Sequence, residues 1–128
     1  RSFAALSSAI ANVDLKRLDR KLAEKIASNP PYASQRNYGA CALEWCYTAA
    51  GFFDLYLHGG QKPWDYAAGA LILEEAGGNM CGFDQDSYWM GSPWQRSVIA
   101  ALDPRLFAQW RDWVRACQAQ NVSNNIIE

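Results

Sequence analysis

Asp65 is the residue of this sequence whose type and position best suit chemistry. It lies near the start of the segment WDYAAGALILEEAGG (64–78), where we expect a helix over residues 65–76 with Asp65 as its N-terminal cap. The small residues 67–70 leave little side-chain bulk on the first turns, so a ligand could approach that backbone closely. The apolar residues 71–73 predict a buried body for the same helix.

A carboxylate at a helix start could serve a hard cation. Helix N-termini favour anions because their first N–H groups lack intrahelical partners. Mg²⁺ prefers carboxylate oxygens together with the phosphate oxygens of a substrate, and a pair of such ions can activate water and stabilise a leaving oxygen. Helix caps are far commoner than metal ligands, so the residues alone favour a plain cap for Asp65.

The remaining candidates give weaker signals. His58, the single histidine, could be a general base or a ligand, although a polar surface residue beside a glycine turn is the commoner role. The four cysteines form no C-x-x-C pair, which disfavours a zinc site and a disulfide framework and indicates a reducing cytoplasm. The spacing of Cys41 and His58 gives no support for a Cys–His nucleophilic pair.

Helical and strand patterns alternate along the chain and predict an α/β fold. We expect a small mixed sheet covered by helices on its faces, all within one unit over residues 1–128. The predicted strands are 34–38, 52–58, 79–83 and 97–102, and the predicted helices are 3–12, 19–28, 41–50, 65–76 and 104–118.

Composition excludes several classes of function. The formal net charge is −1 with acidic and basic residues interspersed, so a nucleic-acid surface is not expected. No apolar run approaches the roughly 20 residues of a membrane span, so no membrane partner is expected. Half of the residues are hydrophobic, which indicates a globular chain with a real core.

Two segments resemble the inositol monophosphatase family, the Mg²⁺-dependent, lithium-sensitive sugar phosphatases. WDYAAGALILEEAGG resembles the family's C-terminal signature, and SQRNYGACALEWCYTAAGFFDLYLHG (34–59) is similar to the segment that precedes it. The resemblance implies that Asp65 binds a catalytic Mg²⁺ and that Ala67, Ala68 and Gly69 keep the helix start open for metal and substrate.

The same resemblance implies a set of substrate-binding residues. His58 stands where inositol phosphatases carry a glutamate that contacts the sugar ring, and Gly39-Ala40, followed by Cys41, stands where many members have Gly-Ser or Gly-Thr. Arg36 belongs to the Arg-x-x-Gly pattern before the helix. The substrate-binding candidates are therefore His58, Ala40, Cys41 and Arg36. The differences at His58 and Ala40 are compatible with a phosphatase but do not identify inositol as the sugar of its substrate.

The family's other metal ligands come from a Glu-Glu pair and an Asp-Pro-x-Asp-Gly-Thr motif, and this chain has no Asp-Gly. We therefore expect the C-terminal, substrate-side half of a cytoplasmic phosphomonoesterase that hydrolyses a sugar phosphate, such as inositol monophosphate, by metal-activated water. The chain alone is expected to be inactive, with its N-terminal half as a partner and a homodimer as the full-length assembly. The alternatives are a non-catalytic interaction domain that keeps the fold and a bisphosphate nucleotidase of the same superfamily.

Overall fold

The protein folds around one mixed sheet. The computed structural model describes residues 5–127. The strands are β1 (Ile10–Val13), β2 (Ser34–Arg36), β3 (Leu55–Gln61), β4 (Asn79–Cys81) and β5 (Arg96–Ala101), in the spatial order β2-β1-β3-β5-β4. β1 runs parallel to β2 and β3, whereas β5 runs antiparallel to β3 and β4.

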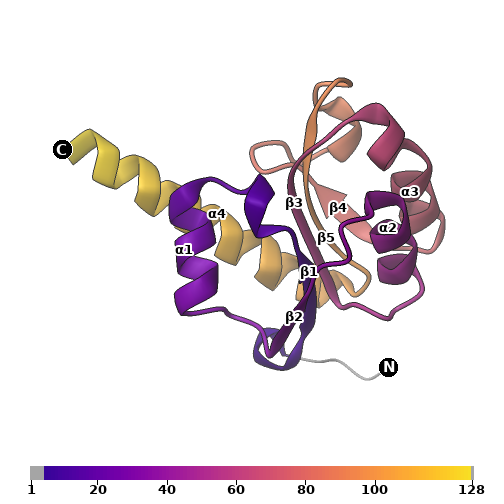
Figure 1. The fold of residues 1–128 in the computed structure, drawn as a ribbon, viewed down its shortest axis with the longest axis horizontal. Helices are drawn as coiled ribbons and strands as arrows, with labels where there is room; N and C mark the ends of the chain where they lie inside the picture. The colour runs from indigo at the N-terminus through magenta and orange to yellow at the C-terminus, as the bar shows by residue number, and fades with distance from the viewer. Residues whose placement is uncertain (1–4, 128) are drawn as a thin grey trace.

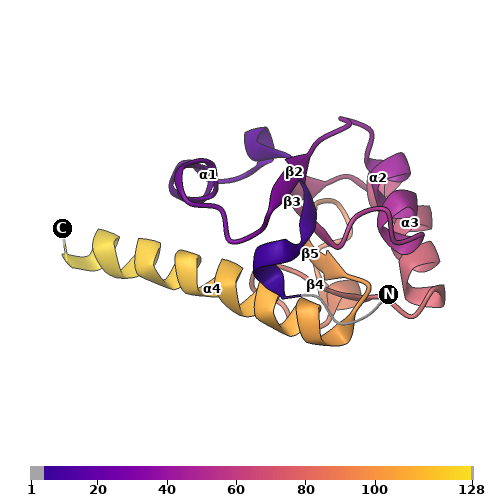
Figure 2. The same ribbon diagram turned by 90° about the horizontal axis from the view of Figure 1, so that it is seen from below.

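Helices cover both faces of this sheet (Figures 1 and 2). α2 (Cys41–Ala49) and α3 (Pro63–Glu75) lie on one face, and α1 (Arg20–Ser28) and α4 (Pro104–Ile127) lie on the other. Short 3-10 helices are η1 (Leu6–Ser8), η2 (Leu15–Arg17) and η3 (Tyr88–Met90). The predicted α/β layered sandwich is confirmed.

Alternation along β3 divides the core between the two layers. Leu55 and Leu57 pack with α1 and α4, whereas Tyr56 packs with α2 and α3. Trp110 of α4 is fully buried, stacks on Trp113 and donates its indole N–H to the carbonyl of Tyr56 at 3.1 Å. The helical spacing of these tryptophans therefore reflects core packing, as the sequence indicates.

The predicted helix over residues 3–12 is wrong. Residues 3 and 4 lie outside the described residues, and the rest holds η1 and the strand β1. β1 lies between β2 and β3, with residues 11–13 buried. A strand buried on both faces shows no alternation of exposed polar and buried apolar residues, so the alanine-rich segment that contains β1 imitates a helix.

The small residues of α3 serve two different purposes. A Cβ at Gly69 would lie 2.4 Å from Cβ of Trp45, so Gly69 lets α3 pack closely on α2. The expectation that Gly69 keeps the helix start open is therefore wrong, whereas Ala67 and Ala68 are exposed. The predicted buried body is also only partly correct: Leu73 is fully buried, but Leu71 and Ile72 are 51% and 45% exposed.

The strand predicted over 52–58 begins later, at Leu55, because the preceding residues turn toward β1. The carboxylate of Asp54 accepts the backbone N–H of Ile10 at 2.8 Å and ties this turn to β1. α1 starts as expected, with the Asp19 carboxylate accepting the N–H of Leu22 at 3.0 Å. Among the described residues, no helix is long and apolar enough to cross a membrane.

Candidate active site

A hollow of about 420 Å³ lies where β1 and β3 end and where α2 and α3 begin. The carboxyl ends of parallel strands and the starts of the helices that follow them commonly meet at a ligand site in α/β folds. Its lining residues are Asp14, Arg17, Gly39, Ala40, Cys41, Glu44, His58, Gly60, Lys62, Asp65 and Gln95. Four of the five predicted site residues, Asp65, His58, Ala40 and Cys41, meet in this pocket.

Asp65 lies in the first turn of α3, but it is not the cap residue. The helix begins at Pro63 and its N-cap is Lys62, so Asp65 occupies the third helical position. One carboxylate oxygen, Oδ2, accepts the N–H of Lys62 at 3.2 Å. The prediction of an N-cap is therefore wrong by three residues, but the carboxylate still stabilises the helix start and faces the pocket.

Ala40 leaves the start of α2 without a side-chain cap. It is the N-cap residue of α2, and its methyl group offers no acceptor to the N–H groups of the first turn. These N–H groups adjoin the pocket, because Gly39, Ala40 and Cys41 all line it. An uncapped helix start of this kind is suited to bind a phosphate oxygen.

Cys41 contributes a thiol at the pocket wall. Burial raises its pKa above the ordinary value, and the nearby carboxylates of Asp65 and Glu44 raise it further. A thiol that stays protonated is a poor nucleophile. Cys41 therefore contributes to the shape of the pocket wall at the start of α2 and does not act as a nucleophile.

His58 is almost completely buried, at 3% exposure. Its Nδ1 accepts the N–H of Gly60 at 3.1 Å, and its Nε2 lies 3.7 Å from Oδ2 of Asp14. Burial lowers the pKa of His58 below its usual value, although Asp14 acts in the opposite direction. The imidazole is therefore neutral near pH 7, with its proton on Nε2 toward Asp14, and Nδ1 has no lone pair left to act as a base.

A buried carboxylate supports the pocket floor. Glu44 is 1% exposed; it accepts the N–H of Tyr38 at 2.9 Å and the hydroxyl of Tyr56 at 3.3 Å. The same hydroxyl accepts from Gln61 at 2.7 Å, and Gln61 accepts the indole N–H of Trp45 at 3.0 Å. This connected network fixes α2 against β3, and with them the start of α2 and the side chain of His58.

The close contact of β3 with η2 brings Asp14 and Arg17 to the pocket. A Cβ at Gly59 would lie 1.5 Å from the carbonyl oxygen of Arg17, so only glycine permits this approach. The pairing of β3 with β5 is irregular between His58 and Gln61, which releases this segment from the regular ladder. Arg17 and Lys62 add positive charge to the pocket, opposite the carboxylates.

Sequence reasoning missed Asp14, Arg17, Glu44 and Gln95. Asp14 and Arg17 follow the segment 3–12, whose pattern predicts a helix, so the sequence does not indicate that they follow the end of a strand. Glu44 is the lone charge in the otherwise apolar or small helix CALEWCYTAA, and that isolation could have indicated a buried carboxylate.

Arg36 lies apart from the other predicted site residues. It lines a different hollow of about 440 Å³ together with Ile10, Tyr38, Leu43, Tyr47, Phe52 and Phe53. Its guanidinium donates to the carbonyl of Gln35 at 3.0 Å. The structure therefore does not bring Arg36 to the Asp65 pocket.

Comparisons with known proteins show which family and which fold this chain resembles. The chain matches the model of the Inositol monophosphatase family over residues 4–119. It is 37% identical over 97 residues to a putative Nus factor SuhB of Neisseria meningitidis, which covers 76% of this chain and 36% of that protein. It is 40% identical over 74 residues to the chloroplastic phosphatase IMPL1 of Arabidopsis thaliana, covering 56% of this chain and 19% of that protein.

A solved structure shows the same fold. The inositol monophosphatase from Zymomonas mobilis superposes with a TM-score of 0.73 and 25% identity, over 89% of this chain and 45% of that one. The matched region is thus less than half of each of these relatives.

Proposed function

This chain belongs to the inositol monophosphatase family, and we propose that it is the C-terminal, substrate-side half of a Mg²⁺-dependent phosphomonoesterase acting on a sugar phosphate such as inositol monophosphate. The proposal rests on one observation above all. Asp65 of α3 and the uncapped start of α2 line the same pocket, so a carboxylate suited to a cation and a helix start suited to an anion border one hollow.

The chain's own residues would bind and orient the ester. The first-turn N–H groups of α2 would donate hydrogen bonds to phosphate oxygens, with Arg17 and Lys62 adding positive charge at the pocket wall. Ala40 and Cys41 would shape this anion site. The buried, neutral His58 would form the wall against which the sugar lies.

Mg²⁺ would supply charge neutralisation and Lewis acidity at the ester. Asp65 is the residue of this chain that we propose as its ligand, because it lines the pocket and only one of its carboxylate oxygens accepts from Lys62. Within the described residues no group of three or more His, Cys, Asp or Glu could hold a metal ion. We therefore propose that the remaining ligands come from an N-terminal half, so that residues 1–128 form one part of a longer enzyme.

A second candidate function is a non-catalytic interaction domain that keeps the fold. Some relatives are named as phosphatases, but the relative from Neisseria meningitidis is named as a putative Nus factor. That name favours a binding role for part of this family. For either function we propose a cytoplasmic location, which the four free thiols support.

Phosphate release by the full-length protein that carries this chain tests the proposal. The panel should include inositol monophosphate, other sugar phosphates and a nucleoside bisphosphate, each with Mg²⁺ and with a chelator. We expect turnover that requires Mg²⁺ and favours a sugar phosphate. A folded full-length protein that hydrolyses none of these esters would contradict the phosphatase proposal and support the interaction domain.

A further inference from the structure

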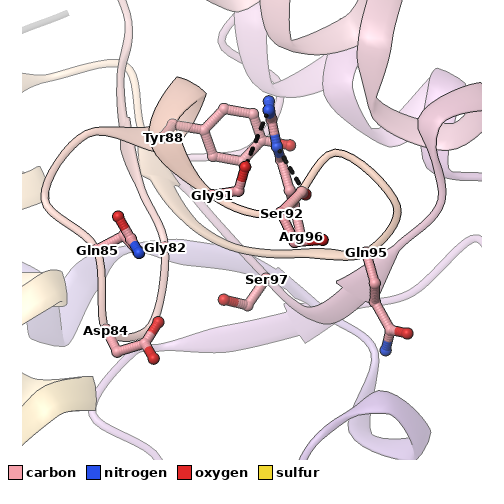
Figure 3. A pocket seen from close by; sticks show the side chains of 9 residues that line it. All are labelled: Gly82, Asp84, Gln85, Tyr88, Gly91, Ser92, Gln95, Arg96 and Ser97. Atoms are coloured by element: carbon pink, nitrogen blue, oxygen red, sulfur yellow. Dashed lines mark hydrogen bonds between the residues drawn. The ribbon is translucent and has the colours of Figure 1, made fainter.

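Gln95 lines the pocket, but it lies outside the two segments that resemble the family and outside the hydrogen-bond network around Glu44. It directly precedes β5 and lines the Asp65 pocket with an exposed side chain. It also borders a second, smaller hollow of about 250 Å³, which Figure 3 shows. In that view its amide points away from Arg96 and Tyr88, on the other side of the segment.

The amide of Gln95 lies directly against the turn that carries His58. A Cβ at Gly60 would lie 2.6 Å from Nε2 of Gln95, so the glycine makes room for this amide. Gly60 in turn donates its N–H to His58. Within the described part of the chain the amide of Gln95 forms no hydrogen bond, so its donor and acceptor are both available to a ligand.

His58, in contrast, has no nitrogen available to hydrogen-bond a ligand. Its side chain is buried, Nδ1 is occupied by the N–H of Gly60, and Nε2 faces Asp14. A hydroxyl of the substrate could therefore bond to His58 only by displacing one of these partners. The polar side chain that lies against this turn and remains available to a ligand is the amide of Gln95.

The segment that carries Gln95 is held in place by Arg96. The Arg96 guanidinium donates to the carbonyl oxygens of Ser92 at 3.1 Å, Trp89 at 3.2 Å and Gly91 at 3.3 Å, and Figure 3 shows two of these bonds. It also lies 4.7 Å from the ring centre of Tyr66.

A further hydrogen bond ties the segment to α3. The hydroxyl of Tyr66 donates to the carbonyl of Pro93 at 2.6 Å. Gln95 therefore adjoins the pocket from a fixed backbone, so binding has to order only its side chain.

We propose that Gln95 is a specificity-determining residue that binds hydroxyl groups of the substrate's polyol portion. An amide can accept from one hydroxyl at Oε1 and donate to a neighbouring one from Nε2, which suits a neutral polyol bearing adjacent hydroxyls. This inference rests on the phosphatase function proposed above. It assigns sugar selection to the edge of the pocket next to β5, away from the phosphate end at α2.

Kinetics with two esters test this assignment in the full-length protein. Gln95→Leu keeps the approximate size of the side chain but removes both hydrogen-bonding groups. We expect kcat/KM for inositol monophosphate to fall about tenfold, mainly through KM, because one or two hydrogen bonds are lost. Activity on phenyl phosphate, which has no sugar hydroxyls, should stay unchanged.

Gln85→Leu is the matched control. Gln85 is also an exposed glutamine beside the smaller hollow, but it does not line the Asp65 pocket. This variant should leave both esters unaffected. An equal loss on both esters in Gln95→Leu, or no change on either, would overturn the role of Gln95 while leaving the phosphatase proposal intact. Wild-type protein that hydrolyses neither ester would instead overturn the proposed function, and this inference with it.

Discussion

At the scale of single residues, His58 shows how burial changes the role of a side chain. A histidine beside a glycine turn would ordinarily be exposed and able to titrate near neutral pH. Here it is enclosed, and the N–H of Gly60 and the carboxylate of Asp14 occupy its two nitrogens. Burial makes protonation of His58 unfavourable in the folded protein, and the Asp14 carboxylate offsets only part of this effect.

The stability of the protein should therefore fall as the pH is lowered below about 6.5. Burial lowers the pKa of His58 in the folded state, so the unfolded chain binds this proton first. Stability is then fully present above the unfolded pKa and is lost as the pH falls toward the folded one. Thermal unfolding between pH 8 and 5.5 measures this dependence.

His58→Gln is the control for the pH effect, because the chain has no other histidine. The melting temperature of the variant should change less with pH over the same range, whatever its absolute stability. A variant whose melting temperature falls with pH as steeply as that of the wild type would contradict this account of His58.

The site could be predicted where a residue carries a local signature. Asp65, Ala40 and Cys41 stand in a recognisable segment, and the structure brings all three to one pocket. Asp14 and Gln95 lie in segments without such a signature and reach the pocket only through the pairing of distant strands. Arg36 shows the reverse, since its segment is recognisable but it lines another hollow.

At the scale of elements, the packing of α2 on α3 determines the width of the pocket. Both helices begin at the pocket, so a change in their separation would move the first turn of α2 relative to Asp65. Gly69 permits the close approach, because Trp45 occupies the space that a side chain would need. Trp45 itself is fully buried and bonded to Gln61.

Gly69→Ala should destabilise the protein by about 1–3 kcal/mol through overpacking against Trp45. The sign is informative, because Gly→Ala inside an unobstructed helix stabilises it by about 1 kcal/mol. Ala68→Gln adds more bulk to an exposed position of the same helix and should change stability by about 0.5 kcal/mol or less. Urea unfolding of all three proteins measures the difference, and a Gly69→Ala protein more stable than wild type would contradict the packing argument.

Elements with a clear period or cap could be predicted from the sequence, and buried ones could not. α1 has its Asp19 cap and α3 its apolar run, and both helices form close to the expected bounds. Residues 11–13 of β1 are buried on both faces of the sheet, so the strand has no exposed polar face and shows no period. The same ambiguity explains why the helix predicted over 3–12 is wrong.

At the scale of the whole molecule, the two helices that begin at the pocket expose several large apolar side chains. Leu43 of α2 and Leu71 and Ile72 of α3 are each more than 40% exposed, and Trp64 at the start of α3 is 78% exposed. Soluble monomers seldom expose such residues together. We propose that these side chains contact the N-terminal half proposed above.

The chain of residues 1–128 alone should therefore self-associate and show no phosphatase activity. Sedimentation velocity at micromolar concentrations should show species larger than the monomer, because the apolar face remains uncovered. The double variant Leu71→Gln, Ile72→Gln should shift the distribution toward the monomer. A monomeric wild-type chain with Mg²⁺-dependent turnover would show that the site is complete within this part.

The most direct test of the central claim is the Mg²⁺ dependence of phosphate release by full-length wild-type protein and its Asp65→Asn variant. Asparagine can still accept the N–H of Lys62, so the helix start is preserved while the charge toward the cation is lost. We predict a loss of stability of no more than about 1 kcal/mol, from the lost charge at the helix start. We also predict a fall in kcat/KM of at least about a hundredfold, which exceeds the loss seen when a group that only supports a metal ligand is removed. An Asp65→Asn enzyme with wild-type turnover and wild-type Mg²⁺ dependence would contradict the claim that this chain carries part of a phosphatase metal site.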